Sequence, residues 1–310
     1  MNSLSRIAVF GANGMLGRAM VDLLYAQAFF KTRYPSRQVV DLTKWDEVKR
    51  WFDFFGPEYV FMMAGKVGGI IANQNEPVEF LEQNAQMAVN VIRASAMTGV
   101  QKLVYTSSSC AYPKHAGNPI SEESLLCGPM EPTNRPYALA KILGMELCAS
   151  YCREYGKNFV CTMPTNLYGP GDHYSVENSH VLPGMMTKIH AAKLDSAAEV
   201  VLWGTGTPIR EFLHSVDCAR AHLSVMEDSA SAGVTNLGGE KICLRDLAAK
   251  IAKVVGYTGT IVWDTTKPDG TPDRQLDNNR ALRAGFTPLL TLTDTLPGIY
   301  SDFLNQLKHQ

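Results

Sequence analysis

The chain has 310 residues, of which 45% are hydrophobic and 19% are charged, and this balance predicts a folded globular protein rather than a disordered one. With 29 Lys and Arg against 30 Asp and Glu, the formal charge is −1, which leaves no overall basic excess to bind nucleic acid or an anionic membrane surface. No apolar run reaches the roughly 18 residues that a membrane-spanning helix requires.

The first half of the chain alternates strand-like and helical patterns. Short apolar runs predict strands over residues 6–10, 38–42, 59–64, 102–106 and 158–163, of which the second is the weakest. Helical periodicity predicts helices over residues 15–24, 45–55, 77–98 and 137–155. Buried strands that alternate with helices form a parallel sheet covered on both faces, so the predicted fold class is α/β with a doubly wound, Rossmann-type sheet.

After Pro164 the pattern becomes less regular. Turn-rich segments, including a loop signature at 203–208, accompany two short predicted helices at 216–227 and 244–255 and a strand at 261–263. We therefore expect a nucleotide-binding domain over residues 1–165 with a return segment near 214–237. Residues 166–213 and 238–310 are expected to form a smaller α+β substrate-binding domain. Ligands of such folds bind at the carboxyl ends of the strands, in the crevice between the two parts.

A glycine-rich turn joins the first predicted strand to the first predicted helix. Its glycines recur at steps of three, which differs from the G-x-G-x-x-G pattern. Such glycines let the backbone approach a pyrophosphate at the helix N-terminus, where free N–H groups and the helix dipole favour anions. Because of this strand–turn–helix context, we interpret the turn as a dinucleotide site rather than as a turn without a ligand. The cofactor-binding residues assigned here are Gly11, Asn13, Gly14, Met15, Leu16 and Gly17.

The residue about twenty positions beyond the glycine turn bears on the choice of dinucleotide. This position usually carries an acid that binds the ribose 2′-OH, but here it is Arg37, with Arg33 nearby. A guanidinium suits a 2′-phosphate, so we predict NADP(H) rather than NAD(H); the alternative is that both arginines are merely solvated. Asp41 could be the missing acid, but we expect it nearer the adenine.

Tyr137 and Lys141 stand four residues apart on one face of a predicted helix. An ammonium beside the phenol is expected to lower the pKa of the phenol and make it a better proton donor near neutrality. Ser108 follows a predicted strand and could hydrogen-bond a carbonyl that is being reduced. A lone Tyr–Lys pair often occurs by chance at a surface. The order of nucleotide turn, serine after a strand and then this helix is far more specific.

These three motifs resemble those of the extended short-chain dehydrogenase/reductases, which act on nucleotide sugars. Within that family, blocks along nearly the whole chain resemble the GDP-L-fucose synthases: residues 66–70 (KVGGI), 108–113 (SSCAYP), 131–134 (EPTN), 163–170 (MPTNLYGP), 178–181 (NSHV), 210–214 (REFLH) and 267–272 (KPDGTP). The resemblance implies an NADPH-dependent enzyme that epimerises GDP-4-keto-6-deoxy-D-mannose at C3 and C5 and then reduces its 4-keto group. A related enzyme for another GDP-4-keto-deoxy sugar, of a colitose or heptose pathway, stays open. A non-catalytic NADP sensor is disfavoured, because sensors commonly lack the Tyr–Lys pair or its serine.

The resemblance also implies roles for single residues. Cys110 and His180 match the base and the acid of epimerisation, and a thiol and an imidazole suit these roles because both can titrate near pH 7. Without the resemblance, they would be read as a small buried residue and a solvated loop histidine. Tyr137 would donate a proton to the alkoxide, Lys141 would bind the nicotinamide ribose and Ser108 would polarise the carbonyl. Further cofactor-binding positions are Arg37, Asp41, Leu42, Ala64, Lys141, Pro164, Asn166, Leu167 and His180.

Five residues match positions that bind the GDP end of the substrate: Lys188, Trp203, Arg210, Asp269 and Arg274. Arg210 matches a position near the diphosphate, where a guanidinium can bind two phosphate oxygens. The chain departs from its relatives at Lys188, where arginine is frequent, and at Asp273, which replaces the first of two basic residues. Asn13 also replaces an arginine of bacterial relatives.

The seven cysteines show neither paired C-x-x-C steps nor the even count of a secreted framework, so we expect reduced thiols and no metal site. Cys148 and Cys152, four apart on a predicted helix, are expected to face the core. Because the first predicted strand begins so near Met1, we expect no signal peptide and a cytoplasmic protein. The expected partners are a GDP-sugar and a second copy of the chain, bound through the helices around 80–98 and 137–155.

Overall fold

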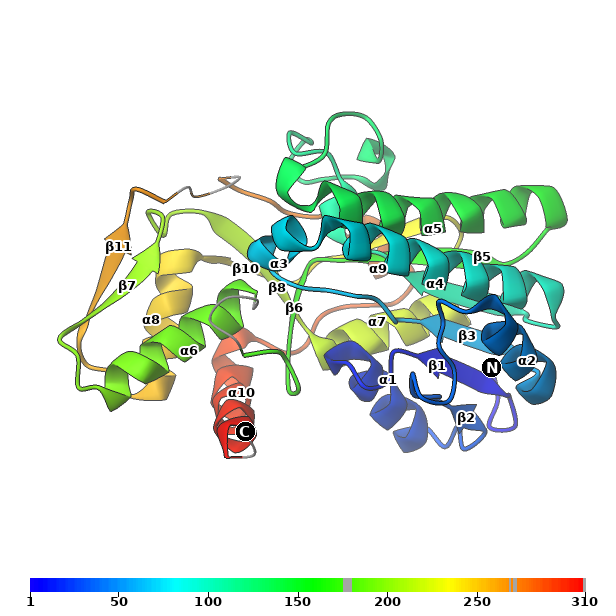
Figure 1. Cartoon of the computed structure of the whole chain (residues 1–310), viewed down its shortest axis with the longest axis horizontal. Coiled ribbons are helices and arrows are strands. Elements are labelled where there is room, and N and C mark those ends of the chain that lie inside the picture. Colours follow the sequence, from blue (N-terminus) through cyan, green and yellow to red (C-terminus); the bar gives the residue numbers. More distant parts are fainter. Residues whose placement is uncertain (175–179, 268, 270–271, 309–310) are drawn as a thin grey trace.

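A computed structural model describes residues 1–174, 180–267, 269 and 272–308 of the chain. Its larger lobe contains the strands β1 (Ile7–Phe10), β2 (Thr32–Arg33), β3 (Tyr59–Met62), β4 (Lys102–Thr106), β5 (Phe159–Pro164) and β9 (Val234–Leu237). These strands form a six-stranded sheet in the order β2-β1-β3-β4-β5-β9, and every neighbouring pair is parallel (Figure 1). The predicted parallel α/β sheet is therefore confirmed.

Helices cover both faces of this sheet. One face carries α2 (Trp45–Phe55), α4 (Pro77–Met97) and α5 (Arg135–Tyr155), and the other carries α1 (Met15–Ala26) and α7 (Ser215–Glu227). Successive side chains of β1 alternate between the two cores, because Ala8 and Phe10 pack on the first side and Ile7 and Val9 on the second. This double burial explains why the strands read as continuous apolar runs.

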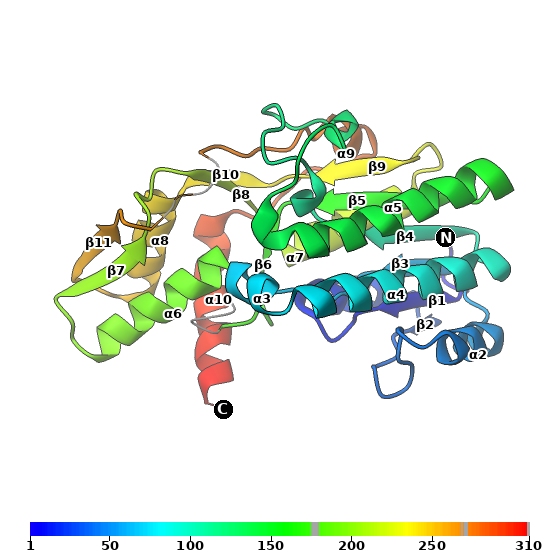
Figure 2. The same ribbon diagram turned by 45° about the horizontal axis from the view of Figure 1, so that its top comes forward.

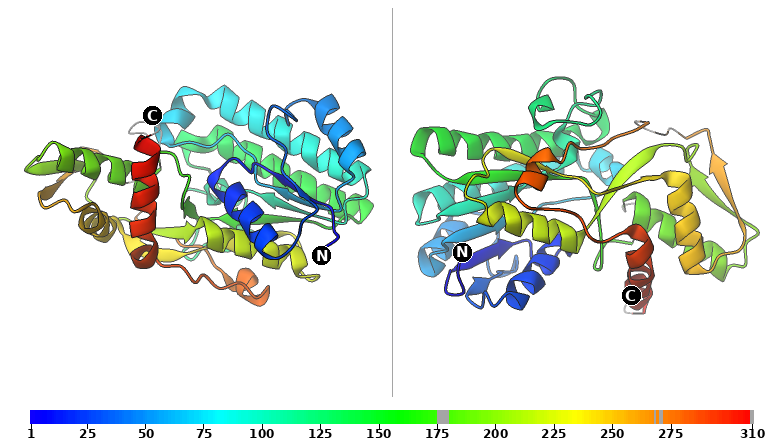
Figure 3. Two further views of the ribbon diagram at one scale, coloured as in Figure 1. Left: turned by 90° about the horizontal axis from the view of Figure 1, so that it is seen from below. Right: turned by 180° about the vertical axis from the view of Figure 1, so that it is seen from behind.

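The smaller lobe combines two short sheets with helices. One sheet has the order β10-β8-β6 and the other pairs β11 with β7. Their strands are β6 (Asn166–Tyr168), β7 (Glu199–Trp203), β8 (Ile209–His214), β10 (Glu240–Cys243) and β11 (Thr260–Asp264). Around them lie α6 (Val181–Leu194), α8 (Leu244–Val255) and α10 (Leu292–Leu307), which share one apolar core (Figure 3). The shorter helices of the chain are α3 (Ile70–Asn75) and α9 (Asn279–Arg283), with the 3₁₀ turns η1 (Ser109–Ala111), η2 (Glu122–Ser124) and η3 (Pro132–Asn134).

The chain crosses between the lobes more than once. After β8 it returns to the larger lobe, where α7 packs beside α1 and β9 becomes the edge strand next to β5. Ala281 and Phe286, which come later still, also pack in the core of the larger lobe. No helix in the described part of the chain is both long and apolar enough to cross a membrane.

The structure corrects the strand predicted at residues 38–42. The N–H groups of Val39 and Val40 both donate to the carbonyl oxygen of Ser36, at 3.0 Å each, so the segment folds into a turn, and β2 takes the edge position instead. Val40 and Leu42 still bury their side chains in the core beneath α2, which explains the strand-like pattern. Trp203 ends β7 rather than lying in the predicted loop.

Several elements of the smaller lobe have no counterpart in the prediction, namely α6, α10, β6, β7, β8 and β10. The predicted helices at 216–227 and 244–255 and the strand at 261–263 are present. Cys148 and Cys152 both pack in the core on the α5 side, as predicted, and all seven cysteines are free thiols.

Candidate active site

The glycine turn after β1 is packed too closely for side chains. A Cβ atom on Gly17 would lie 2.1 Å from the carbonyl oxygen of Gly11, and one on Gly11 would lie 2.6 Å from the backbone nitrogen of Ala64. Gly11 also has a φ of 92°, which favours glycine. Gly14 precedes α1 and offers no side-chain cap, so the first N–H groups of the helix have no side-chain partner from their N-cap residue. The turn is therefore suited to an anion.

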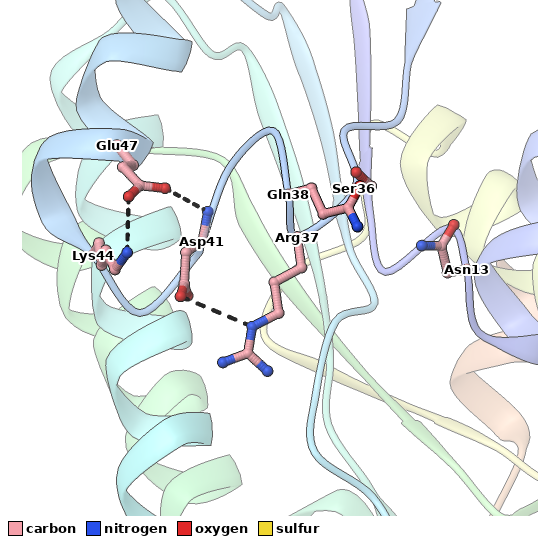
Figure 4. A pocket seen from close by; sticks show the side chains of 7 residues that line it. All are labelled: Asn13, Ser36, Arg37, Gln38, Asp41, Lys44 and Glu47. Atoms are coloured by element: carbon pink, nitrogen blue, oxygen red, sulfur yellow. Dashed lines mark hydrogen bonds and ion pairs between the residues drawn. The ribbon is translucent and has the colours of Figure 1, made fainter.

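A cavity of about 570 Å³ opens beside this turn. Its lining residues are Asn13, Ser36, Arg37, Gln38, Asp41, Lys44 and Glu47, and Figure 4 shows Asn13 on the side of the glycine turn with Arg37 and Asp41 across from it. The Arg37 Nε lies 3.8 Å from Asp41 Oδ2, and the arginine side chain is 74% exposed. Hydrogen bonds from Thr43 lower the pKa of Asp41, so this carboxylate stays ionised. The cavity thus has the exposed Arg37 guanidinium on one side and the glycine turn on the other. This arrangement fits a dinucleotide with a phosphate on its ribose.

The remaining predicted cofactor residues occupy different surroundings. Ala64 follows β3 and touches Gly11, whereas the Leu42 side chain is buried in the core and does not line the cavity. Pro164 ends β5, and the Asn166 Nδ2 donates to the backbone oxygen of Glu211 at 2.9 Å. Four predicted apolar residues pack as follows: Leu16 lies in the core, Leu167 lies against it, Met15 approaches Gly169, and Pro164 pairs with Leu237.

A cluster of polar side chains forms where β4 ends. Ser108 follows this strand, and its Oγ accepts a hydrogen bond from the backbone nitrogen of Cys110 at 3.3 Å within the start of η1. Lys141 on α5 donates its Nζ proton to the carbonyl oxygen of Thr106, the last residue of β4, at 2.9 Å. Tyr137 lies one turn earlier on α5, where its pKa responds to both Ser108 and Cys110. The structure thus brings together four predicted catalytic residues.

The predicted lowering of the Tyr137 pKa is wrong, because the pKa of this phenol is raised. Burial raises the pKa of Tyr137, the nearby Cys110 raises it further, and Ser108 opposes the rise. Burial also lowers the pKa of Lys141 to about 8. The Lys141 Nζ lies 5.7 Å from the Tyr137 ring centre, and desolvation is the largest cause of the pKa shift of each group. Tyr137 is consequently a fully protonated phenol near neutral pH.

Asn84 on α4 lies beside the candidate site but was not among the residues predicted from the sequence. Its Oδ1 accepts from the backbone nitrogen of Lys66 at 2.8 Å, and its Nδ2 donates to the carbonyl oxygens of Lys66 and Phe80 at 3.0 and 2.7 Å. A Cβ on Gly65 would lie 3.1 Å from this Oδ1 and 3.4 Å from the Nζ of Lys141. Asn84 therefore fixes the loop after β3 beside Lys141. An isolated asparagine within a helical pattern carries no signal of such a role.

His180 lies in the other lobe, as the N-cap residue of α6. In Figures 1 and 2 the N-terminal end of α6 lies beside α3, on the side that faces the larger lobe. Desolvation lowers the pKa of His180, so its imidazole is neutral near pH 7 and can take up a proton. Residues 178–179 of its sequence block lie outside the described residues.

The predicted substrate-binding residues gather in the smaller lobe. The Lys188 Nζ lies 4.8 Å from the centre of the Trp203 ring, which is 55% exposed. The Asp269 carboxylate accepts from the backbone nitrogen and the hydroxyl of Thr205, at 2.7 and 2.8 Å. Arg210 donates to the backbone oxygen of Asp269 at 3.3 Å, and burial lowers its pKa. Pro268, Gly270 and Thr271 of the same block lie outside the described residues.

Arg274 differs from the other four because it reaches the larger lobe. Its guanidinium donates to the carbonyl oxygens of Ser109 and Tyr112, at 2.8 and 3.4 Å. These two residues flank Cys110 in and after η1. A residue expected to bind substrate is therefore bonded to the turn that holds a predicted catalytic thiol.

Comparison with known proteins places these features in a family. Residues 7–238 match the model of the NAD dependent epimerase/dehydratase family. A protein named GDP-L-fucose synthase from Sinorhizobium fredii is 43% identical over 97% of this chain and 96% of its own length. A GDP-L-colitose synthase from Yersinia pseudotuberculosis is 32% identical over 97% of this chain and 98% of its own. The structure of a GDP-L-fucose synthetase from Naegleria fowleri bound to NADP is similar with a TM-score of 0.89 and 29% identity, covering 99% of this chain and 96% of that one.

Proposed function

Because the chain belongs to the NAD dependent epimerase/dehydratase family, we propose that it converts GDP-4-keto-6-deoxy-D-mannose into GDP-L-fucose with NADPH, by epimerisation at C3 and C5 and reduction of the 4-keto group. The observation that carries the proposal is the grouping of Ser108, Cys110, Tyr137 and Lys141 at the end of β4 in a chain 43% identical to a GDP-L-fucose synthase. The lower identity, 32%, to the colitose enzyme favours the fucose substrate over that alternative.

The residues present fit NADP(H), which is the cofactor of this protein. The glycine turn has no room for side chains and would hold the pyrophosphate at the start of α1. Arg37 would bind the 2′-phosphate across the cavity, and Lys141 would bind the nicotinamide ribose. When bound, NADPH supplies the hydride that reduces the C4 carbonyl.

Reduction needs a proton for the C4 oxygen as negative charge develops there. We assign this proton to the Tyr137 phenol, which burial keeps protonated in the cofactor-free protein. The Ser108 hydroxyl would donate a hydrogen bond to the same oxygen and stabilise the charge. Lys141, held by the Thr106 carbonyl oxygen, would stabilise the phenolate that remains on Tyr137 after the transfer.

Epimerisation needs a base on one face of the sugar and an acid on the other. The proposed base, Cys110, lies after β4 in the larger lobe, and the proposed acid, His180, precedes α6 in the smaller lobe. The 4-keto group acidifies the C–H bonds at C3 and C5, so Cys110 as base would take the proton from the carbon on one face, and His180 would give one on the other face after it has itself taken up a proton. Before the second centre is inverted, Cys110 must release the proton that it took and His180 must be protonated again. The diphosphate and guanosine would contact Lys188, Trp203, Arg210 and Asp269 in the smaller lobe, where these side chains gather.

We also propose that the chain forms a homodimer through α4 and α5. The two helices lie side by side along one flank of the larger lobe (Figure 2). Their exposed apolar side chains are Val78, Leu81, Met97, Leu139 and Leu143. A four-helix contact between two copies would bury these side chains.

The test is NADPH oxidation, followed at 340 nm, with GDP-4-keto-6-deoxy-D-mannose and identification of the product sugar. The proposal expects GDP-L-fucose from the wild type. Tyr137→Phe should lower the reduction rate by about 10²- to 10⁴-fold, the usual contribution of a general acid. Cys110→Ser should slow epimerisation while NADPH binding stays near normal. An unepimerised 4-hydroxy sugar from the wild type would remove the roles given to Cys110 and His180, and a clear preference for a colitose or heptose precursor would replace the substrate.

A further inference from the structure

A segment near the C-terminal end of the chain joins the smaller lobe to the catalytic turn. This linking segment comprises residues 272–277. On one side, the Ile209 nitrogen at the start of β8 donates to the Pro272 oxygen at 2.8 Å, and the Leu276 nitrogen donates to the buried carboxylate of Glu211 at 2.9 Å. Both contacts fix the segment to the strand that also carries Arg210.

On its other side the linking segment contacts the stretch that follows η1. The Ile120 nitrogen donates to the Gln275 oxygen at 2.7 Å, and the Asp277 nitrogen donates to the Ile120 oxygen at 2.9 Å. The Gln275 nitrogen donates to the Asn118 side chain, also at 2.9 Å. The backbone of the segment is therefore held from both lobes, so the position of Arg274 between these anchors is well defined.

Arg274 uses this position to hold the turn that contains Cys110. Its NH2 group donates to the carbonyl oxygen of Ser109, which also accepts from the Tyr112 nitrogen, and to the carbonyl oxygen of Tyr112. Cys110 lies between these two carbonyls, and its own backbone nitrogen is bonded to Ser108. The guanidinium thus links the carbonyl oxygens at the two ends of this turn. It can do so because its planar group carries several N–H donors and can bind two oxygens at once.

We propose that Arg274 is a positioning residue for Cys110 and thereby for the epimerisation half of the reaction. The proposal rests on the proposed function, because it takes Cys110 as the base. A base must lie within hydrogen-bond reach of the proton that it removes, and a misplacement of about 1 Å can cost about 100-fold in rate. The two bonds of Arg274 go to Ser109 and Tyr112, whereas the residue before Ser108 is fixed to β5, because the Ser107 nitrogen donates to the Thr162 oxygen at 2.8 Å. Reduction should therefore depend less on Arg274 than epimerisation does.

The competing role for Arg274 is direct binding of the substrate diphosphate. Arg274 and Arg210 are near enough for their charges to interact, and this repulsion contributes to the lowered pKa of Arg210. A residue that only binds the diphosphate would change the affinity for GDP and the KM. A residue that positions Cys110 would instead change the rate of proton removal at saturating substrate, which separates the two roles.

The experiment measures proton removal without reduction. Holoenzyme with NADP⁺ is incubated with GDP-4-keto-6-deoxy-D-mannose in D₂O, and deuterium at C3 and C5 is followed by mass spectrometry. Arg274→Met removes the N–H donors, and Arg274→Lys keeps the charge without the fork. Arg280→Gln is the control: it loses guanidinium contacts with the Val234 carbonyl oxygen and with Glu122 and Glu123, all of them outside η1. GDP affinity by calorimetry and the unfolding temperature are recorded for each variant.

We expect the rate of deuterium incorporation at saturating substrate to fall by about 100-fold in Arg274→Met, while the affinity for GDP changes by less than about threefold. The exchange rate of Arg274→Lys should lie between those of the wild type and Arg274→Met, and the exchange rate of Arg280→Gln should equal that of the wild type. With NADPH, the product of Arg274→Met should shift towards the unepimerised sugar. Normal saturated exchange with weakened GDP binding would overturn the proposal and make Arg274 a substrate ligand. Absence of exchange in the wild type would instead refute the proposed function.

Discussion

The packing of the glycine turn allows a quantitative test with Gly17→Ala. The added Cβ would lie 2.1 Å from the Gly11 oxygen and 2.6 Å from the Ala12 Cα, both backbone atoms, whereas ordinary contacts begin near 3.4 Å. The start of α1 must therefore move by about 1 Å away from the turn. Forced overpacking of this kind typically costs about 1–3 kcal/mol. Because the same turn would hold the pyrophosphate, a cost of this size expressed in binding equals roughly 5- to 150-fold in NADPH affinity.

The assay combines fluorescence titration with NADPH and urea unfolding of the cofactor-free protein. We expect Gly17→Ala to weaken NADPH binding, to lower the free energy of unfolding, or to do both, with the two losses together accounting for the cost of the clash. Gly14→Ala is the local control, because its Cβ would meet the Gly11 oxygen at 3.4 Å without a clash, so its cost should stay below the roughly 1 kcal/mol that alanine costs at an N-cap position. Gly298→Ala in α10, with nothing within 4 Å, should stabilise the protein by up to about 1 kcal/mol. Wild-type binding and stability in Gly17→Ala would refute the described packing of the turn.

Three further perturbations test other parts of the site. Arg37→Ser should weaken NADPH binding by about 10- to 100-fold, the worth of a charged hydrogen bond, and leave NADH binding unchanged; equal losses for both would exclude a 2′-phosphate contact. Burial lowers the pKa of Lys141 to about 8 in the folded protein, whereas its pKa in the unfolded chain is near 10.5. The destabilisation from the buried charge is therefore complete below pH 8 and disappears as the pH rises from 8 to 10.5. The unfolding free energy of the wild type relative to Lys141→Met should thus rise by roughly 2–3 kcal/mol between pH 7 and 10, and a constant difference would show that Lys141 is not desolvated. Leu143→Glu should halve the molar mass in light scattering, whereas Leu307→Glu at the far end of α10 should not; an unchanged mass in both would remove α5 from the interface.

The larger lobe could be predicted because its buried strands are short continuous apolar runs and its helices repeat their apolar residues at helical spacing. Ile7 to Phe10 form a short apolar run, and the helices around them repeat their apolar residues at helical spacing. The elements of the smaller lobe are harder to predict from the sequence. Helix α10 contains Pro297 and Gly298, two residues that disfavour a helix interior, and burial of Leu296, Ile299 and Phe303 stabilises it nevertheless. Leu292, Leu296, Ile299 and Phe303 do recur at helical spacing, but the Pro–Gly pair between them favours a break, and only the packing shows that the helix continues through it.

The site shows the same division. The sequence motifs identified the residues that the structure groups after β4, because each lies beside a strand end or on a helix face. The motifs could not predict the pKa of Tyr137, because it depends mainly on the burial of the phenol in the fold and not on the spacing to Lys141. The bond from Arg274 to Ser109 joins residues 165 positions apart, and no spacing rule connects such positions.

The edge strand β9 has a consequence for how the protein can be made. Its partner β5 is complete at Pro164, but the pairing residues Val234–Leu237 follow only after some seventy further positions, including β6, α6, β7 and β8. During synthesis the nascent sheet therefore exposes the β5 edge while most of the smaller lobe is still being translated, and unpaired edges promote association between chains. A fragment ending near residue 165 would retain that open edge permanently. Expression of the isolated first part of the chain is accordingly expected to give aggregated material. In the full chain β9 pairs with that edge, and side chains cap backbone groups of β9 in turn, because the Asn236 nitrogen donates to Glu122 and the Val234 oxygen accepts from Arg280.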